Sequence, residues 1–367
     1  MFFFLCLTFG LSLAVGLLVV RRARGHAGRY DNAKPQRFHI GDVPRIGGLS
    51  LFASIACGWI VAPIALYYEN AGNLGIDWRT SLTWGAVVLP ALIGGLGEDL
   101  TQRLSVRYRL VLTGTSAAFA LYLMDVEVPR LGAPWFDMAL DMLPWLGAVI
   151  AFVAITGLPH AFNIIDGYNG LSGMVALIVS LALIYVALQV GDRQLAGILV
   201  CLTGATGGFL VWNYPRGMLF AGDGGAYLWG VTIAVGSLVL VQRHDLVSPW
   251  FPMLLLIYPV WETLFSMYRK SARGVSPGVA DALHFHQLIY RRIVHGVFHD
   301  DESRRVLMRN NRTSPYLWTF TLLTVAPAVL FWRNTPVLMA FCALFVVTYV
   351  ACYLMIIRFK VPRWLRR

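Results

Sequence analysis

The sequence predicts an all-α fold, that of a polytopic integral membrane protein. Hydrophobic residues make up 57% of its 367 residues, charged residues only 13%, and the mean hydropathy is +0.64. Soluble domains carry roughly 25% charged residues, so the composition excludes that class. Apolar runs of about 16 to 23 residues recur along the whole chain, long enough to cross a hydrocarbon core about 30 Å thick. We expect residues 1–367 to form one membrane domain.

Eleven apolar runs are predicted to be crossing helices. They cover residues 1–20, 45–67, 80–97, 110–125, 143–160, 172–190, 195–212, 226–241, 249–267, 315–332 and 336–357. The first run has no basic segment before it and is followed by Arg21 and Arg22, the reverse of the order in a cleaved secretory signal. We therefore expect it to remain as the first crossing.

Lys and Arg gather on one side of this predicted topology. That side holds 25 of the 30, in the loops 21–44, 98–109, 213–225 and 268–314, in the tail 358–367 and at Arg45. Because cytoplasmic loops are enriched in Lys and Arg, the N-terminus is predicted outside and the C-terminus inside. The net charge of +11 therefore predicts no nucleic-acid partner, and the basic tail is expected to bind anionic lipid head groups.

The cysteines all fall inside the apolar runs and include no Cys-x-x-Cys pair. They are Cys6, Cys57, Cys201, Cys342 and Cys352. We expect small buried hydrophobic side chains here, with neither a disulfide nor a cysteine metal site.

A polar, glycine-rich turn, residues 160–173, separates the fifth and sixth crossings. Asn163, Asp166 and Asn169 recur every third residue, so a helical or turn-like winding directs them to roughly the same side. Gly167 and Gly170 allow backbone to approach a ligand closely. The alternative is that the Asn and Asp side chains cap the next helix.

Two adjacent carboxylates, Glu98 and Asp99, end the third crossing. Like charges at a poorly solvated helix end repel each other, and a divalent cation or a transferable proton would offset that cost. The alternative is a solvated pair neutralised by Arg103, Arg107 and Arg109.

A second acidic position follows the seventh crossing. Asp223 lies between Gly222 and Gly224 at the start of the eighth crossing, so backbone N–H groups of that helix lie beside its carboxylate. This arrangement can hold a metal ion and the phosphates that the ion bridges. A plain turn with an Asp cap explains the pattern equally well.

The inner loop 268–314 contains His284 and His286. Histidines two apart point to opposite sides of a helix, so joint action requires an extended or irregular backbone. The same loop predicts an amphipathic surface helix with its apolar side at Leu288, Ile289, Ile293 and Val297, and with His295 and His299 on its polar side. Zinc would require further ligands at suitable spacing.

Glu262, near the inner end of the ninth crossing, is an ionisable residue within an apolar run and therefore a functional candidate. Pairing with Arg269 or Arg273 is the structural alternative. All the polar clusters fall on the predicted cytoplasmic side. Several carboxylates without cysteine ligands favour a hard, oxygen-liganded ion such as Mg²⁺, which usually acts on phosphates.

Together these stretches resemble the polyprenyl-phosphate N-acetylhexosamine-1-phosphate transferases, glycosyltransferase family 4, in the same order from residue 31 to about 290. The motifs are Pro44-Arg45-x-Gly47-Gly48, Glu98-Asp99, Asn163-x-x-Asp166-Gly167-x-x-Gly170-Leu171, Asn213-x-Pro215 with Phe220-x-Gly222-Asp223-x-Gly225, and Asp281-x-x-His284-x-His286. The family usually has Asp, Asn and Asp where this chain has Glu98, His160 and Asn169, and often His where it has Gln287.

The resemblance implies transfer of a sugar 1-phosphate from a UDP-N-acetylhexosamine to undecaprenyl phosphate at the cytoplasmic face of a bacterial inner membrane. It implies that Glu98 or Asp99 deprotonates or orients the lipid phosphate, and that Asp223 and Asp99 bind Mg²⁺, with Mn²⁺ as an alternative. The implied substrate-binding residues are Asn163, Asp166, Asn169, Asn213, Phe220, His284 and His286. A homodimer is also compatible with the resemblance.

The His-x-His ending is closer to the polysaccharide branch of the family, so O-antigen, capsule or a related surface glycan is the expected product. Two other classes compete with this interpretation. A transporter or lipid-linked sugar flippase would also have many crossings, but it usually shows repeat-related broken helices with binding residues near the bilayer midplane. An inactive relative would owe its loss of activity to Glu98 or Asn169.

Overall fold

The computed structural model describes residues 1–23, 42–67, 74–274, 283–294, 296 and 299–358, and the regular secondary structure within them is helical. The first seven helices are α1 (Phe2–Arg22), α3 (Gly47–Tyr67), α4 (Trp78–Thr101), α5 (Val106–Met124), α6 (Pro134–Met142), α7 (Trp145–Ile165) and α8 (Leu171–Gln189). The others are α9 (Arg193–Asn213), α10 (Gly222–Arg243), α11 (Trp250–Leu255), α12 (Ile257–Ala272), α13 (Phe285–Arg292), α14 (Glu302–Leu330) and α15 (Thr335–Ile357).

The chain is a polytopic membrane protein. Eight of the described helices are long and apolar enough to cross a membrane: α1, α3, α4, α7, α8, α9, α10 and α15. The predicted crossings 110–125, 249–267 and 315–332 are also helical, in α5, in α11 with α12, and in α14. The number of eleven crossings and the predicted orientation of the termini remain predictions.

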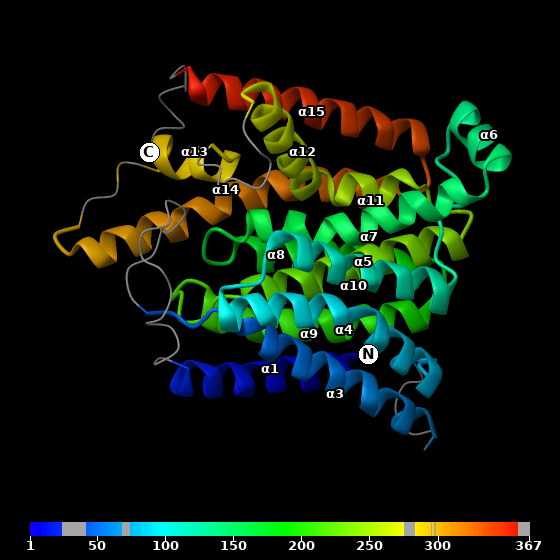
Figure 1. Cartoon of the computed structure of the whole chain (residues 1–367), viewed down its shortest axis with the longest axis horizontal. Helices are drawn as coiled ribbons and strands as arrows, with labels where there is room; N and C mark the ends of the chain where they lie inside the picture. The colour runs from blue at the N-terminus through cyan, green and yellow to red at the C-terminus, as the bar shows by residue number, and fades with distance from the viewer. Residues whose placement is uncertain (24–41, 68–73, 275–282, 295, 297–298, 359–367) are drawn as a thin grey trace.

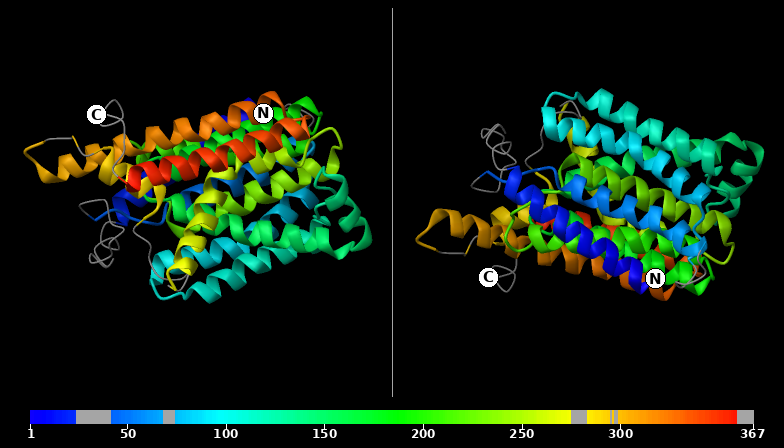
Figure 2. Two further views of the ribbon diagram at one scale, coloured as in Figure 1. Left: turned by 90° about the horizontal axis from the view of Figure 1, so that it is seen from above. Right: turned by 90° about the horizontal axis from the view of Figure 1, so that it is seen from below.

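The long helices form one bundle with two different ends (Figure 1). The N-terminus and the short α6 lie at one end, and α13 with the start of α14 lies at the other. Two further views place α4 and α5 along one edge of the bundle and α14 along the opposite edge (Figure 2).

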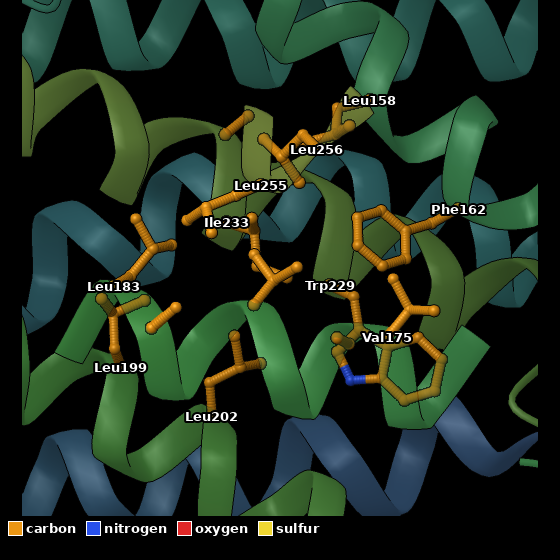
Figure 3. Packing of buried hydrophobic residues seen from close by; sticks show 14 of the residues in the cluster. Leu158, Phe162, Val175, Leu183, Leu199, Leu202, Trp229, Ile233, Leu255 and Leu256 are labelled. Atoms are coloured by element: carbon orange, nitrogen blue, oxygen red, sulfur yellow. The ribbon is translucent and has the colours of Figure 1, made fainter. Parts of the chain in front are cut away.

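The centre of the bundle is α10. It packs against α3, α4, α7, α8 and α9. Of the 18-residue apolar segment of α10 that could cross a membrane, 94% is buried inside the protein. Figure 3 shows Trp229 and Ile233 of α10 surrounded by leucines from α7, α8, α9 and α11. The Trp229 indole N–H donates to Thr206 Oγ1 at 2.9 Å, so its one polar atom is satisfied within the core.

Helical structure extends further into the polar segments than hydropathy predicts. The helix α7 continues to Ile165, α12 ends at Ala272, and α14 begins at Glu302. Within the predicted loop 268–314, the helix α13 takes the place of the predicted surface helix, but six of its eight residues are buried, His286 and Gln287 among them. Leu288, Ile289 and Ile293 are buried as predicted for the apolar side. Asp281, His295, Val297 and the basic tail from residue 359 lie outside the described residues.

Candidate active site

A cavity of about 1840 Å³ lies among α4, α5, α7, α10, α12 and α15, and its polar part collects most of the predicted site residues. The predicted residues that line it are Glu98, Asp99, Asn163, Asp166, Asn213, Phe220, Asp223, His284 and His286. Arg45 and Arg109 line the same cavity. Side chains spread over almost 190 positions of the chain therefore share one cavity.

Glycines bring three helices into contact beneath this polar region. A Cβ atom on Gly95 of α4 would lie 2.5 Å from the backbone nitrogen and Cα of Gly224 in α10. A Cβ on Gly48 of α3 would lie 2.5 Å from the nitrogen of Gly225. Because non-bonded carbon atoms need about 3.5 Å or more, only glycine permits this approach.

Backbone hydrogen bonds fix the segment that carries Arg45. The N–H groups of Gly47 and Gly48 donate to the carbonyls of Phe220 and Ala221, both at 2.9 Å. The Phe220 N–H in turn donates to the Pro44 carbonyl at 2.9 Å. This pairing places Arg45 beside the start of α10.

Asp99 caps α10 from the neighbouring helix α4. Its Oδ1 accepts from the Asp223 N–H at 2.9 Å and its Oδ2 from the Gly224 N–H at 2.8 Å. A carboxylate here satisfies two amides of a helix N-terminus and interacts favourably with the helix dipole. Asp99 is only 5% exposed, and both of its oxygens contact α10, so its geometry is that of a residue that positions Asp223.

Glu98 has a different local partner. Its Oε2 accepts from the Leu104 N–H at 2.8 Å, within the turn that connects α4 to α5. The two neighbouring acids are therefore separated by hydrogen bonding, Glu98 toward the α4–α5 turn and Asp99 toward α10. Both still line the cavity.

Asp223 forms an ion pair with Arg109, from the first turn of α5. The Tyr227 hydroxyl, one turn along α10, donates to Asp223 Oδ2 at 3.4 Å. His160 of α7 continues the network, with its Nδ1 3.3 Å from the Tyr227 hydroxyl and its Nε2 3.2 Å from Thr113 Oγ1. Tyr227 and Thr113 are not recognisable as site residues from the sequence, since single polar residues inside apolar helices form no motif.

The turn after α7 places Asp166 in the cavity. Asn163 lies within the last turn of α7, and Asp166 is its C-cap residue. Asp166 is half-buried, and desolvation of its carboxylate raises its pKa to about 7. Gly167 faces His286, whose Nε2 would lie 3.3 Å from a Cβ at that position.

Asn169 does not line the cavity, although it is part of the same predicted motif. It is fully buried, and its side chain donates to Asn311 Oδ1 at 3.0 Å. Its N–H donates to Asn310 Oδ1 at 2.8 Å, and its carbonyl accepts from the Ser314 hydroxyl at 2.6 Å. The predicted substrate contact of Asn169 has no support from this geometry, which instead connects the α7–α8 turn to α14.

Asn213 lines the cavity but also secures two turns. Its Oδ1 accepts from the Gly170 N–H at 2.6 Å, and its Nδ2 donates to the Leu219 carbonyl at 2.8 Å. The α7–α8 turn and the segment before α10 are therefore held together through one side chain.

His284 and His286 lie together, with ring centroids 5.3 Å apart and planes inclined by only 4°. His284 has an extended backbone, φ −63° and ψ 148°, and precedes the first turn of α13. This irregularity brings two side chains of an i, i+2 pair to one side. Behind them, Glu262 accepts from His284 Nδ1 at 3.0 Å.

The donor set for a metal ion is small. Among the described residues, no group of three or more His, Cys, Asp or Glu side chains could hold a metal ion. Proteins often bind Mg²⁺ with only one or two carboxylates, and water and substrate phosphates supply the remaining oxygens. Asp223 fits that chemistry, whereas the oxygens of Asp99 are engaged with α10. All five cysteines are free thiols.

Comparison with known proteins identifies related chains. The model of the family described as glycosyl transferase family 4 matches residues 81–241. The probable undecaprenyl-phosphate N-acetylglucosaminyl 1-phosphate transferase of Bacillus subtilis is 25% identical over 290 residues, covering 79% of this chain and 76% of the relative. The undecaprenyl-phosphate alpha-N-acetylglucosaminyl 1-phosphate transferase of Thermotoga maritima is 26% identical over 263 residues, 72% of this chain and 73% of the relative.

A third relative represents another branch. The phospho-N-acetylmuramoyl-pentapeptide-transferase of Moorella thermoacetica is 31% identical over 178 residues, which cover 46% of this chain and 54% of the relative.

Proposed function

Because the chain belongs to glycosyl transferase family 4, we propose that it transfers a sugar 1-phosphate from a UDP-N-acetylhexosamine to undecaprenyl phosphate and releases UMP. The names of the relatives support the reaction class. The cavity supports it independently, because one space combines charged groups with a long apolar lining.

The apolar part of the cavity suits a prenyl chain. Its lining includes Val153 of α7, Leu256, Val260 and Leu264 near and along α12, and Val346 of α15. An isoprenoid would reach this lining from equally apolar lipid, so packing contacts along the lining, rather than removal from water, would direct the chain. Its phosphate would then reach Arg45 and Arg109 at the polar end. This continuity of apolar and charged lining carries the proposal.

The nucleotide and sugar would occupy the polar end. Phe220 offers an aromatic face for the uracil, and Asn163 and Asp166 offer hydrogen-bond partners. His284 and His286 line the same space and would contact the sugar or the phosphates. Glu98 keeps the predicted role of orienting or deprotonating the lipid phosphate, while Asp99 positions Asp223.

We assign the divalent cation, Mg²⁺ or alternatively Mn²⁺, to Asp223 together with the substrate phosphates. When bound, it would neutralise the diphosphate and stabilise charge on the leaving UMP. Arg109 now pairs with Asp223, and its guanidinium has further N–H donors for phosphate oxygens. A carboxylate and a guanidinium at one point can thus bind a cation and an anion side by side.

The reaction would occur at the cytoplasmic face of a bacterial inner membrane. The acids of the site lie where α4 and α7 end and where α10 begins, next to the segments 98–109 and 213–225 of the predicted Lys- and Arg-rich side. The product would begin synthesis of O-antigen, capsule or a related surface glycan.

A transfer assay tests the proposal. Membranes containing the protein receive undecaprenyl phosphate, Mg²⁺ and a panel of radiolabelled UDP-sugars, and labelled lipid is extracted. We expect product with an N-acetylhexosamine donor. The variant Asp223→Asn should lower turnover at least 100-fold, as expected for loss of a metal-binding charge.

The matched control is Asp245→Asn. Asp245 also pairs with an arginine, Arg130, but its side chain is 97% exposed and lies outside the cavity lining. This variant should retain full turnover. Full turnover of Asp223→Asn would overturn the metal assignment, and absence of labelled lipid with every donor would overturn the proposed reaction.

A further inference from the structure

Glu262 of α12 is an acid inside the protein, with no exposed surface. Neither predicted partner contacts it: the Arg269 guanidinium lies over the Phe265 and Tyr353 rings, and Arg273 Nε donates to the Arg269 carbonyl. Three other groups do. Its Oε1 accepts from His284 Nδ1 and from the Phe285 N–H, both at 3.0 Å, and its Oε2 accepts from the Tyr349 hydroxyl at 2.9 Å.

A buried carboxylate is an expensive way to join helices. Removing the charge from water costs several kcal/mol, and well-packed apolar side chains often stabilise a fold equally well. The three donors come from the start of α13 and from α15, and they satisfy both oxygens. Since packing alone does not require an acid here, the charge points to a function for the group that it holds.

That group is the imidazole of His284. A carboxylate only accepts hydrogen bonds, so Nδ1 of His284 must carry a proton. Its Nε2 is then the nitrogen that remains for a ligand in the cavity, which His284 lines. The parallel His286 ring and the Phe285 N–H bond to the same carboxylate restrict rotation of this segment.

We infer that Glu262 is a positioning residue that holds His284 as the Nδ1–H tautomer, so that Nε2 accepts a hydrogen bond from the sugar of the donor substrate. The identity of the ligand rests on the proposed function, but the tautomer does not. A neutral Nε2 is an acceptor, and the hydroxyl and amide N–H groups of an N-acetylhexosamine are donors. The ribose hydroxyls and uracil N3–H are donors as well, but UDP retains them, so binding of UDP distinguishes the two.

Nitrogen NMR of the histidine rings tests the tautomer. The protein has eight histidines, and the His284→Asn variant identifies the His284 signals in a ¹⁵N-histidine-labelled sample in detergent. At a pH where the ring is neutral, the wild type should show Nδ1 protonated and Nε2 unprotonated. A wild-type spectrum with the proton on Nε2 overturns the inference without any variant.

Three substitutions separate the hydrogen bond from general packing. The Glu262→Gln variant retains an oxygen that accepts from His284 Nδ1, so His284 should remain the Nδ1–H tautomer. In Glu262→Leu this oxygen is absent, and the preference for the Nδ1–H tautomer should be lost. Tyr349→Phe removes only the donor to Oε2 and should keep it. A folded Glu262→Leu protein with an unchanged His284 spectrum would contradict the positioning role.

Equilibrium binding tests the ligand. The Glu262→Leu variant should bind the donor UDP-N-acetylhexosamine about 10-fold more weakly than the wild type does. This loss is expected for one hydrogen bond of about 1.4 kcal/mol. The affinity for UDP should be unchanged. Equal weakening of UDP binding would show that His284 contacts the nucleotide and would overturn the sugar assignment. If the transfer reaction fails in every assay, the NMR result still decides the tautomer.

Discussion

Asn169 shows at the scale of one residue that membership in a motif does not settle a role. Its amide joins the α7–α8 turn to Asn311 of α14, away from the cavity. An aspartate at this position would keep the backbone N–H bond to Asn310 Oδ1, but its side chain could not donate to Asn311 Oδ1. The identity of residue 169 therefore bears on the α7–α8 turn more directly than on the nucleotide.

The substitution Asn169→Asp tests this difference. We expect it to destabilise the protein by about 1–3 kcal/mol, since a buried donor is replaced by a carboxylate facing an amide oxygen. Thermal unfolding in detergent should show a lower Tm. The ratio of turnover with different UDP-sugars should stay the same, and a change of preferred donor would instead place residue 169 against the nucleotide-sugar.

Asp166 predicts a pH dependence of stability. Its pKa of about 7 in the folded protein lies above the ordinary value of 3.8, so the folded state keeps a proton that the unfolded state releases. Stability from this group is therefore fully present below about pH 4 and is lost as the pH rises to about 7. The Tm of the wild type should fall across that range relative to Asp166→Asn, measured in parallel without substrate. Parallel curves would contradict the raised pKa.

The site acids are recognisable from sequence because charges are rare in apolar surroundings. Their partners are not. Asp99 contacts the amide of Asp223, 124 positions away, and this contact exists only because glycines of α4 and α10 meet. Nothing in the local sequence around Asp99 distinguishes a helix cap from a metal ligand, so the cap contacts of Asp99 with α10 could not be predicted.

At the scale of helices, close packing of α4 on α10 makes a further prediction. In Gly95→Ala the new Cβ would meet α10 backbone at 2.5 Å, which forces the helices apart. We expect a lower Tm and at least a 10-fold loss of turnover, since Asp99 would no longer reach both amides of α10.

Gly85 provides the control within the same helix. A Cβ there has no neighbouring atom within 4 Å, so Gly85→Ala should be neutral, or stabilising by up to about 1 kcal/mol through helix propensity. Thermal unfolding and the transfer assay on both variants decide the matter. If Gly95→Ala behaves like Gly85→Ala, the contact between α4 and α10 does not support the site.

Hydropathy locates the helices but not their ends. Each predicted crossing is helical, yet the run 249–267 is divided at Leu256 into α11 and α12, and α14 is one helix of 29 residues with a polar first half. A hydropathy pattern detects the apolar segment that crosses the lipid. It does not detect the part of a helix that extends beyond the lipid and is stabilised there by tertiary contacts. Asn163 was for this reason expected in a turn.

At the scale of the whole molecule, the charge distribution predicts orientation. Arg103 lies in the turn between α4 and α5, at the predicted cytoplasmic end, and Asp141 lies in α6 at the other end. In intact spheroplasts, a membrane-impermeant maleimide should label Asp141→Cys and should label Arg103→Cys only after lysis. The native cysteines lie within helices, so unsubstituted protein measures the background. The reverse pattern would invert the topology.

The burial of α10 on nearly every side has a consequence for biogenesis. All of its main neighbours, α3, α4, α7, α8 and α9, precede it in the chain and leave the ribosome first. They cannot associate into a finished bundle before α10 is synthesised, because no path would remain for it to enter. We therefore expect the early helices to leave a gap for α10 in the bilayer, and we expect a nascent chain halted before residue 222 to be degraded faster than one halted after residue 243.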